Sequence, residues 1–454
     1  MKIILVQNHL GRHTSHAPMF PLGLSYIATA LQGHEVTIFD MNLWDLSVSF
    51  EKLKKKLSDF KPDIVGLSLR NVDTTQRSDI FCYYKTLKSI TELISATTPG
   101  IPIVIGGTGF SMFAKQLMEM NPLIDFGIYL EGEESFPELL ENLRNPQSVK
   151  GLLYREKDVV LFTGDREPIE FEKYPIPRRD QSLIDIDPFI CEAHDSIGIQ
   201  SKRGCVLNCA YCSYPALSGR TMRLRKPNHV VDEIEYLISL GVHRFSFADN
   251  IFNVPVTHAR EICEEIIKRK LDVEWSAWYE IRNADEELMR LAQRAGCIHF
   301  RFSPDGGTNK ALDVLRKGIT VEDIEESLKI AKRIHGIRVS YNFLCMLPGM
   351  TFLDFVKTLF LHAKVHIIFA GRGGGGLGWV RIYPNTEILQ LAIAEGYMCE
   401  HTDMLPEDEK KLKKLFYYRR SYVMIDKLLI NYIKFMNKML KPALKAFLKR
   451  FVKA

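Results

Sequence analysis

Residues 204–215 read GCVLNCAYCSYP, which places Cys205, Cys209 and Cys212 in a Cys-x3-Cys-x2-Cys spacing. Three thiolates so close in sequence can share one site only if the backbone loops around it, and the glycine and asparagine of this stretch favour such a loop. Structural zinc takes four ligands, and no fourth cysteine or histidine lies nearby. A four-iron cluster is usually held by four cysteines, so three would leave one iron open to another ligand.

The same spacing, with Tyr211 directly before the third cysteine, resembles the radical S-adenosylmethionine (radical SAM) superfamily. In that family the open iron chelates the amino and carboxylate groups of S-adenosylmethionine (SAM). The resemblance implies a [4Fe-4S] cluster on the three cysteines, SAM as a cofactor and an external electron donor for the cluster. The competing interpretation is that the three cysteines are incidental. A disulfide framework is disfavoured, because the chain has nine cysteines, an odd number, and its first residues do not read as a secretory signal.

The size of the chain, 454 residues, predicts two or three domains, and 46% of hydrophobic residues is enough for sizeable cores. The first residues form a short apolar run followed by polar ones, which predicts a buried strand rather than a signal peptide. No apolar run approaches the ~20 residues that span a bilayer. We therefore expect a cytoplasmic protein, whose reducing surroundings suit the cysteines and the cluster.

The formal net charge of +5 is unevenly distributed. Residues 407–454 contain 14 Lys and Arg against 4 Asp and Glu, a net +10 that leaves −5 on the rest of the chain. Between Leu428 and Phe451 large apolar residues recur at helical spacing with lysines among them, and Pro442 divides the run. This basic region, 396–454, is predicted to be helical. Three interpretations stay open: a helix packed on the protein, peripheral contact with a membrane surface, or docking of a protein or nucleic-acid partner.

Residues 1–150 alternate short apolar runs with helix-period segments, which predicts a parallel, doubly wound, Rossmann-like α/β sheet. Ligands of such sheets lie at the carboxyl ends of the strands. The predicted strands are Lys2–Val6, Glu35–Phe39, Asp63–Leu69, Pro102–Ile105 and Phe126–Leu130. The predicted helices are Leu22–Leu31, Phe50–Phe60, Tyr83–Ser95, Met112–Met120 and Phe136–Leu143. A Gly-x-Gly-x-x-Gly turn after the first strand is missing, which disfavours NAD.

Four segments of this region, 21–26, 62–68, 106–107 and 131–134, resemble the cobalamin-binding domain that precedes the radical core in cobalamin-dependent radical SAM enzymes. The resemblance extends over nearly all of residues 1–395 and implies a cobalamin cofactor. It assigns cofactor contacts to strand-end residues, namely Ser68, Asn71, Val72, Gly106, Gly107, Thr108, Glu131, Gly132 and Glu134. The Asp-x-His-x-x-Gly motif of His-on cobalamin proteins is absent, so we expect no histidine on cobalt and interpret His9, His13 and His16 as ordinary loop residues.

Arg70 follows an apolar strand at the end where a corrin would lie. In the similar tryptophan 2-C-methyltransferase, an arginine near this point approaches the lower face of cobalt. A cation has no lone pair to donate, so it would leave that face uncoordinated. The resemblance therefore gives Arg70 a catalytic role. The alternative is an arginine that binds a corrin propionamide or pairs with a carboxylate such as Asp73.

Residues 151–195 read as an extended connector with one short hairpin, Leu152–Arg155 with Val159–Thr163, and Cys191 and His194 do not make a site. Residues 196–395 contain six βα units, which predicts a partial (β/α)6 barrel with its site at the carboxyl ends of the strands. The predicted strands are Ile197–Lys202, Arg244–Ala248, Glu274–Trp278, His299–Ser303, Val339–Leu344 and Gly378–Tyr383. The predicted helices are Val230–Leu240, Pro255–Arg269, Asp285–Gly296, Asn309–Leu315, Val321–His335 and Phe352–His362.

Further matches to the radical SAM core fall at these strand ends. The resemblance implies that Asp249 contacts the SAM amino group and that Asp305 stands where the family has the acid of its ribose-binding segment. It assigns further cofactor contacts to Tyr211, Asn250, Gly306, Met346 and Tyr383. The glycine-rich run at residues 371–378 resists regular structure. It is expected to be either a mobile loop near the substrate mouth or a plain flexible linker.

As a whole, the resemblance implies an enzyme that transfers a methyl group from SAM through methylcobalamin to a carbon of an amino-acid, peptide or protein substrate. Both a 5′-deoxyadenosyl radical route and a polar route fit. One alternative is a cobalamin-dependent radical SAM methylase or cyclase acting on a lipid or tetrapyrrole. The basic region 396–454 favours this alternative. A second alternative is a non-catalytic cobalamin-binding sensor. No nucleic-acid substrate is expected, because a methylthiotransferase needs three more N-terminal cysteines and residues 1–150 contain only Cys82.

Overall fold

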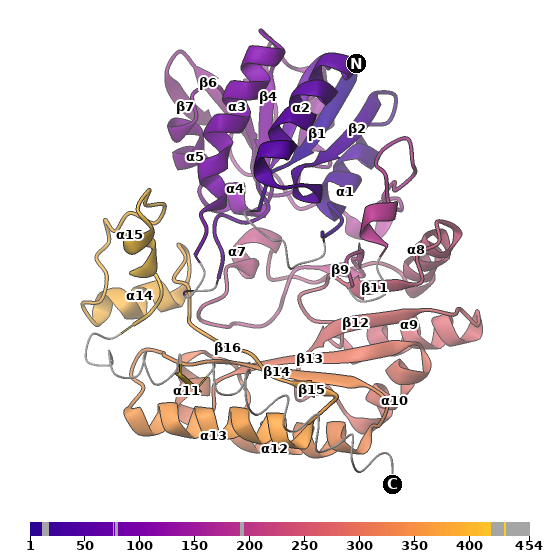
Figure 1. Cartoon of the computed structure of the whole chain (residues 1–454), viewed down its shortest axis with the longest axis vertical. Helices are drawn as coiled ribbons and strands as arrows, with labels where there is room; N and C mark the ends of the chain where they lie inside the picture. The colour runs from indigo at the N-terminus through magenta and orange to yellow at the C-terminus, as the bar shows by residue number, and fades with distance from the viewer. Residues whose placement is uncertain (11–17, 76, 78–79, 191–194, 419–430, 433–454) are drawn as a thin grey trace.

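The computed structural model describes residues 1–10, 18–75, 77, 80–190, 195–418 and 431–432. Figure 1 shows two α/β units stacked along the long axis of the molecule, with α7 (Tyr214–Ser218) at the junction between them. His13, His16, Cys191, His194 and nearly all of the amphipathic tail lie outside the described residues. In the part of the chain that is described, no helix has the length and apolar character needed to cross a membrane.

The first unit is built on a sheet with the strand order β2-β1-β3-β4-β5-β6-β7. Its strands are β1 (Lys2–Gln7), β2 (Glu35–Asp40), β3 (Ile64–Ser68), β4 (Ile103–Gly106), β5 (Phe126–Ile128), β6 (Leu152–Glu156) and β7 (Val159–Phe162). The first five run parallel, whereas β6 and β7, the hairpin predicted in the connector, join the same sheet antiparallel. The strand order reverses between β1 and β3, which is where doubly wound sheets bind their ligands.

Helices cover both faces of this sheet, because successive side chains of a buried strand point to opposite sides. Ile3 and Leu5 of β1 belong to one core cluster, whereas Ile4 and Val6 belong to another. The helices are α1 (Leu22–Ala30), α2 (Leu46–Phe60), α3 (Thr86–Thr97), α4 (Thr108–Met112), α5 (Ala114–Met120) and α6 (Ser135–Glu141). The predicted doubly wound fold is confirmed, and the helix predicted over Met112–Met120 is divided into α4 and α5.

The second unit is a parallel sheet in the order β15-β14-β13-β12-β11-β8, with β16 also pairing with β14. Its strands are β8 (Gly198–Ile199), β11 (Arg244–Phe247), β12 (Glu274–Tyr279), β13 (Cys297–Asp305), β14 (Arg338–Leu344), β15 (Gly373–Gly374) and β16 (Leu377–Gly378). Its helices are α8 (Pro227–Ser239), α9 (Val256–Lys268), α10 (Glu286–Arg294), α11 (Asn309–Val314), α12 (Val321–Arg333) and α13 (Phe352–Ile368). Figure 1 shows α12 and α13 along the outer side of the sheet, as in the predicted partial barrel.

The prediction for the glycine-rich run is wrong, because β15 and β16 lie within it and pair with β14 at the sixth position of the barrel. A Cβ on Gly373 would lie 1.9 Å from the carbonyl oxygen of Val339, and one on Gly375 would lie 2.0 Å from that of Tyr341. The glycines therefore let two backbones approach closely. Residues 379–383, predicted as the sixth strand, contain only an isolated bridge from Arg381 to Phe416.

The connector packs between the two units instead of running free. Leu183, Ile184, Ile186 and Phe189 are buried in the core cluster that also contains residues of α1, α8 and β11. On the far side of the junction, α14 (Glu387–Ala394) and α15 (Glu409–Lys413) lie beside the first unit (Figure 1).

A buried ion pair also joins the two units. Asp73, just after β3, accepts hydrogen bonds from Arg381 Nε at 3.1 Å and Arg381 Nη2 at 3.0 Å, and a further one from Tyr383 at 3.3 Å. The side chains of Asp73 and Arg381 are almost completely buried, so removal of either partner would leave an uncompensated charge in the interior.

Gly375→Ala is expected to lower the free energy of unfolding by about 1–3 kcal/mol, because the new Cβ has to displace the backbone of β14. Gly378→Ala is the matched control, since its Cβ would meet only the side chain of Leu344, at 3.8 Å. Denaturant unfolding of both variants beside the parent protein measures the difference. Equal stability of the two variants would contradict a tightly paired sixth strand.

Candidate active site

A cavity of about 1240 Å³ lies between the two units, where the carboxyl ends of β1, β3, β4 and β5 face those of β8 and β11. Residues of the first unit that line it include Gln7, Ser68, Arg70, Asn71, Gly106, Gly107, Thr108, Glu131, Gly132 and Glu133. Residues of the second unit include Gln200, Lys202, Arg203, Gly204, Tyr214, Leu217, Ser218 and Asn250. The volume exceeds the roughly 300–1,000 Å³ of ordinary small-molecule pockets, so the cavity is large enough for a bulky cofactor.

Most of the strand-end residues predicted to contact cobalamin line this cavity. The exceptions are Val72, which is buried in the core, and Glu134, which forms an ion pair with Arg166 at 3.2 Å. Gly107 has a φ of +103°, and a Cβ there would lie 2.7 Å from the carbonyl oxygen of Leu69. The turn after β4 therefore packs directly on the backbone that follows β3, which requires glycine at this position.

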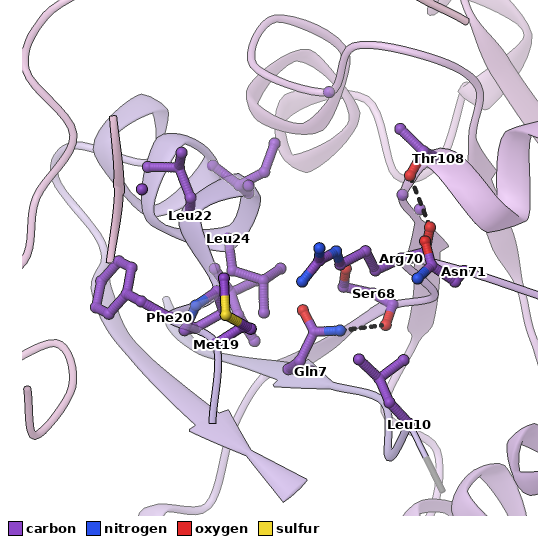
Figure 2. A pocket seen from close by; sticks show the side chains of 18 of the residues that line it. Gln7, Leu10, Met19, Phe20, Leu22, Leu24, Ser68, Arg70, Asn71 and Thr108 are labelled. Carbon is purple, nitrogen blue, oxygen red and sulfur yellow. Dashed lines mark hydrogen bonds between the residues drawn. The ribbon is translucent and has the colours of Figure 1, made fainter. Parts of the chain in front are cut away.

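Arg70 is exposed at the end of β3, and Figure 2 shows its guanidinium pointing into the pocket beside Gln7. It does not pair with Asp73, whose carboxylate binds Arg381, so that pairing is wrong, whereas binding of a corrin propionamide stays a prediction. The backbone carbonyl of Arg70 accepts a hydrogen bond from Thr108 at 2.7 Å, which fixes the strand end beneath the side chain.

The charge of Arg70 acts on two neighbours, the buried Asp40 and the cavity-lining Tyr214. Burial raises the pKa of Asp40 to about 6, and Arg70 opposes this shift. Burial also raises the pKa of Tyr214, again opposed by Arg70. His9 lines the cavity too, and its Nε2 lies 3.2 Å from the carbonyl oxygen of Trp44, to which it can donate.

The cysteine stretch is a loop with a narrow neck. The neck is a two-stranded ladder of β9 (Lys202–Arg203) and β10 (Arg223–Leu224). Gly204 has a φ of +87°, and a Cβ there would lie 2.1 Å from the carbonyl oxygen of Thr221, so only glycine fits. The backbone N–H of Cys205 donates to Gly219 at 3.1 Å and closes the loop.

Within the loop, Cys205 is buried, and Cys209 and Cys212 are half-buried. Burial, together with the charges of Cys209 and Cys205, raises the pKa of Cys212 to about 12. Close, partly enclosed thiols of this kind become thiolates readily only when a metal centre supplies positive charge, so this soft donor set fits an iron–sulfur cluster. In the described ranges, no three His, Cys, Asp or Glu side chains, these thiols included, are placed to share a single metal ion, whereas a four-iron cluster takes each thiolate on a different iron.

Asp305 supports the cysteine loop from the end of β13. Its Oδ2 accepts hydrogen bonds from the Tyr211 hydroxyl at 2.5 Å and from Lys317 Nζ at 2.9 Å. Burial alone would lower the pKa of Lys317, but the charges of Asp305 and Cys209 outweigh burial and raise this pKa above its usual value. Lys317 therefore places a cation beside the thiols, a contact that we did not predict. A lysine after a helix carries no sequence signature of such a contact.

Asp249 lies at the end of β11 and is buried. Its carboxylate accepts hydrogen bonds from Ser201 N at 2.7 Å, Ser201 Oγ at 2.5 Å and Lys202 N at 3.2 Å. Asp249 thus holds the chain that enters the cysteine loop. The amide of the next residue, Asn250, which lines the cavity, lies 3.4 Å from the carbonyl oxygen of Gly204.

The remaining predicted contacts of the radical core are not brought to the cavity wall. Met346 is buried in a core cluster with Trp379. Gly306 packs against Leu312, and Tyr383 binds Asp73 of the first unit. Sequence reasoning missed a different residue, Tyr214, which follows the third cysteine closely, lines the cavity and is 50% exposed there. Its place two residues after Cys212 was the available clue.

Residues 199–362 match the family model described as the Radical SAM superfamily, and residues 9–140 match that of the B12 binding domain. An uncharacterized methyltransferase of Pyrococcus horikoshii is 27% identical over 384 residues, which cover 83% of this chain and 79% of the relative. The anaerobic magnesium-protoporphyrin IX monomethyl ester cyclase of Cereibacter sphaeroides is 28% identical over 359 residues, 73% of this chain and 55% of the cyclase.

Among solved structures, the radical S-adenosylmethionine methyltransferase TsrM from Kitasatospora setae, with tryptophan substrate and a SAM analogue bound, is similar in fold. Its TM-score is 0.75 at 24% identity, over 88% of this chain and 77% of that chain. This likeness extends across both units, so the predicted succession of a Rossmann-like unit and a radical SAM barrel is confirmed as a fold.

Replacement of Cys205, Cys209 and Cys212 together by alanine is expected to abolish the visible absorbance of the cluster and the cleavage of SAM. The reason is that these three thiols are the cluster ligands implied by the loop. Iron analysis of anaerobically reconstituted protein is the measurement, and Cys399→Ala, an exposed thiol outside the loop, is the control. Unchanged iron content in the triple variant would rule out these ligands.

Arg70→Ala is expected to shift the electron paramagnetic resonance spectrum of cob(II)alamin toward a water-bound form while the cobalamin content stays close to that of the parent. The reason is that, with Arg70 beneath the corrin as predicted, removal of its cation would let water reach that face. Arg70→Lys, which keeps a cation, is the matched control. A spectrum that does not respond to Arg70→Ala would return this residue to a structural role, and nitrogen superhyperfine splitting in the parent would contradict the expected absence of a histidine ligand.

Proposed function

The chain belongs to the cobalamin-dependent radical SAM methyltransferases, and on this premise we propose that it methylates a carbon atom of an amino-acid, peptide or protein substrate. Membership of an enzyme family replaces the alternative of a non-catalytic sensor. The proposed division is a cobalamin-binding domain over residues 1–150, a connector over 151–195, a radical SAM domain over 196–395 and a helical region over 396–454. The β6–β7 hairpin extends the first sheet into the connector.

The observation that carries the proposal is the cavity shared by the two units. On one wall are the strand ends of the B12 binding domain, including Ser68, Gly106 and Thr108, which would hold the corrin. On the other wall are Gly204 and Tyr214, which flank the three cysteines of the loop that would hold the cluster; the cysteines themselves do not line the cavity. When bound, cobalamin would supply methyl-carrier chemistry, and the cluster with SAM would supply reducing and methyl-donor chemistry. A site enclosed between two units also keeps water from the reacting groups.

The chain's own residues orient the ligands. Tyr214 offers a half-exposed aromatic surface from the cluster side of the cavity, suited to an apolar or aromatic substrate group. Arg70 offers a cation from the facing wall. Asp305, Lys317 and Asp249 do not line the cavity and would act by holding the cysteine loop in place.

Two considerations favour an amino-acid substrate. Residues 70–73 and 107–110 resemble the amino-acid-modifying members of the family. The structural neighbour TsrM was solved with tryptophan as its substrate. The second candidate is a tetrapyrrole, because the magnesium-protoporphyrin cyclase is a relative of similar identity. We further propose an external electron donor and a cytoplasmic setting. The membrane contact considered for the basic tail falls on residues outside those described.

The proposed function predicts transfer of a trideuteromethyl group from labelled SAM to an amino-acid, peptide or protein fraction of an anaerobic cell extract. Mass spectrometry of the amino-acid, protein, lipid and pigment fractions is the measurement. The variant that lacks the three loop cysteines is the control, because it should leave only the label that the extract's own methyltransferases introduce. Label confined to the pigment or lipid fraction would overturn the proposed substrate class in favour of the alternative.

A further inference from the structure

We propose that Glu131, supported by Glu133, is a positioning residue that fixes the separation between the cobalamin and the cluster, rather than a cobalamin ligand. This inference rests on the family assignment and not on the substrate class. It concerns the neck of the cysteine loop, the β9–β10 ladder, and the turn that follows β5 in the first unit.

The neck determines where the cluster lies. In the ladder, Arg203 is paired with Arg223, and Lys202 with Leu224. Arg203 is separated from Cys205 only by Gly204, whose backbone touches Thr221. Because the loop is closed so tightly, a displacement of these two arginines displaces the three thiols with them.

Both arginines of the neck bind the same carboxylate of the first unit. Arg223 binds Glu131 through two hydrogen bonds, from Nη1 at 2.7 Å and from Nη2 at 2.8 Å. Arg203 Nη1 lies 3.1 Å from Glu131 Oε1, and Arg203 Nη2 lies 2.6 Å from Glu133 Oε1. Paired N–H donors on a carboxylate fix orientation as well as distance, so the contact works as a clamp.

The clamp is shielded from solvent and supported from behind. The side chains of Arg203, Arg223, Glu131 and Glu133 are 10%, 17%, 15% and 5% exposed. The guanidinium of Arg203 stacks 4.4 Å from the ring centre of Phe171. Screening by salt is weak at such exposure, which distinguishes these ion pairs from surface pairs of little energetic value.

The hydrogen-bonding capacity of Glu131 is largely used within the clamp. Besides the arginines, the backbone N–H of Ile169 donates to Glu131 Oε2 at 3.0 Å, and Arg223 in turn donates to the carbonyl oxygen of Ile169 at 3.0 Å. Burial alone would raise the pKa of Glu131, but the hydrogen bonds from Arg223 and the charge of Arg203 outweigh burial and lower this pKa. A corrin amide would have to displace these partners, whereas the neighbouring Gly132 lines the cavity with bare backbone.

Glu131 lies where a contact with the neck links the two cofactor sites. It follows β5 on the edge of the sheet that would carry the corrin, and the arginines flank the loop that would carry the cluster. The clamp therefore joins the two cofactor platforms by a direct side-chain contact, to which Ile169 and Phe171 of the connector add support. Loss of the clamp is expected to leave both cofactors bound, but the distance between them should then vary from molecule to molecule.

The test is the magnetic coupling between cob(II)alamin and the reduced cluster in the full-length holoenzyme, measured by pulsed electron paramagnetic resonance without substrate. We expect Glu131→Gln to retain the parent's iron and cobalamin content but to lose the single defined coupling, with a broad distribution of distances in its place. Arg223→Gln should have the same effect. The double variant should add little to the effect of Glu131→Gln alone, because the contact that Arg223→Gln removes is already weakened by the loss of the Glu131 charge.

Glu138→Gln is the matched control, since it removes the same charge from the same unit but breaks an ion pair with Arg166, which lies outside the neck. It should keep the parent's coupling. If Glu131→Gln does not fold, Glu131→Asp, which keeps the charge and shortens the reach, takes its place. A parent-like coupling in the Glu131 and Arg223 variants would overturn the proposal. Loss of cobalamin from a folded Glu131 variant would overturn it in favour of a direct ligand.

Discussion

The close backbone approach at Gly204 is the constraint on which the candidate active site depends. A side chain there would collide with the carbonyl oxygen of Thr221, at 2.1 Å from its Cβ, so the chain can enter and leave the cysteine loop side by side only with glycine at this place. The narrow neck gathers three thiols that are close in sequence into one loop. It also turns Arg203 and Arg223 toward the first unit, so a single steric requirement shapes both the cluster site and the contact between the units.

The sequence was sufficient to predict both parallel sheets and the loop, because these depend on local patterns. Buried parallel strands read as short apolar runs, and the intervening helices show a period near 3.6. The side chains predicted at the carboxyl ends of the first sheet, such as Ser68, Arg70 and Thr108, meet in one cavity because parallel strands all end at the same edge. Cys205, Cys209 and Cys212 were recognisable because their spacing is itself the motif.

The errors concern partners that are distant in sequence. The glycine run was predicted to be irregular on its composition, but the backbone of β14, some thirty residues earlier, is what requires glycine there. Asp73 was a candidate partner for the nearby Arg70, but it binds Arg381, which is 308 residues away. Glu131 was predicted to contact the cofactor because it lies in a segment that resembles a cofactor site. Only the folded chain brings Arg203 and Arg223 to its carboxylate. Ion pairs of this kind leave no local pattern to read.

The buried pair of Asp73 and Arg381 also bears on how the chain is made. Strand β3 leaves the ribosome early, but the cation for Asp73 follows 308 residues later, which corresponds to roughly 15 to 60 s at about 5–20 residues per second. Throughout that interval the first unit holds a carboxylate without its partner, and the apolar side of α1 lacks the core of the second unit. The nascent first unit therefore has the surface of a chaperone client, and the junction between the two units can close only after most of the barrel has been synthesised.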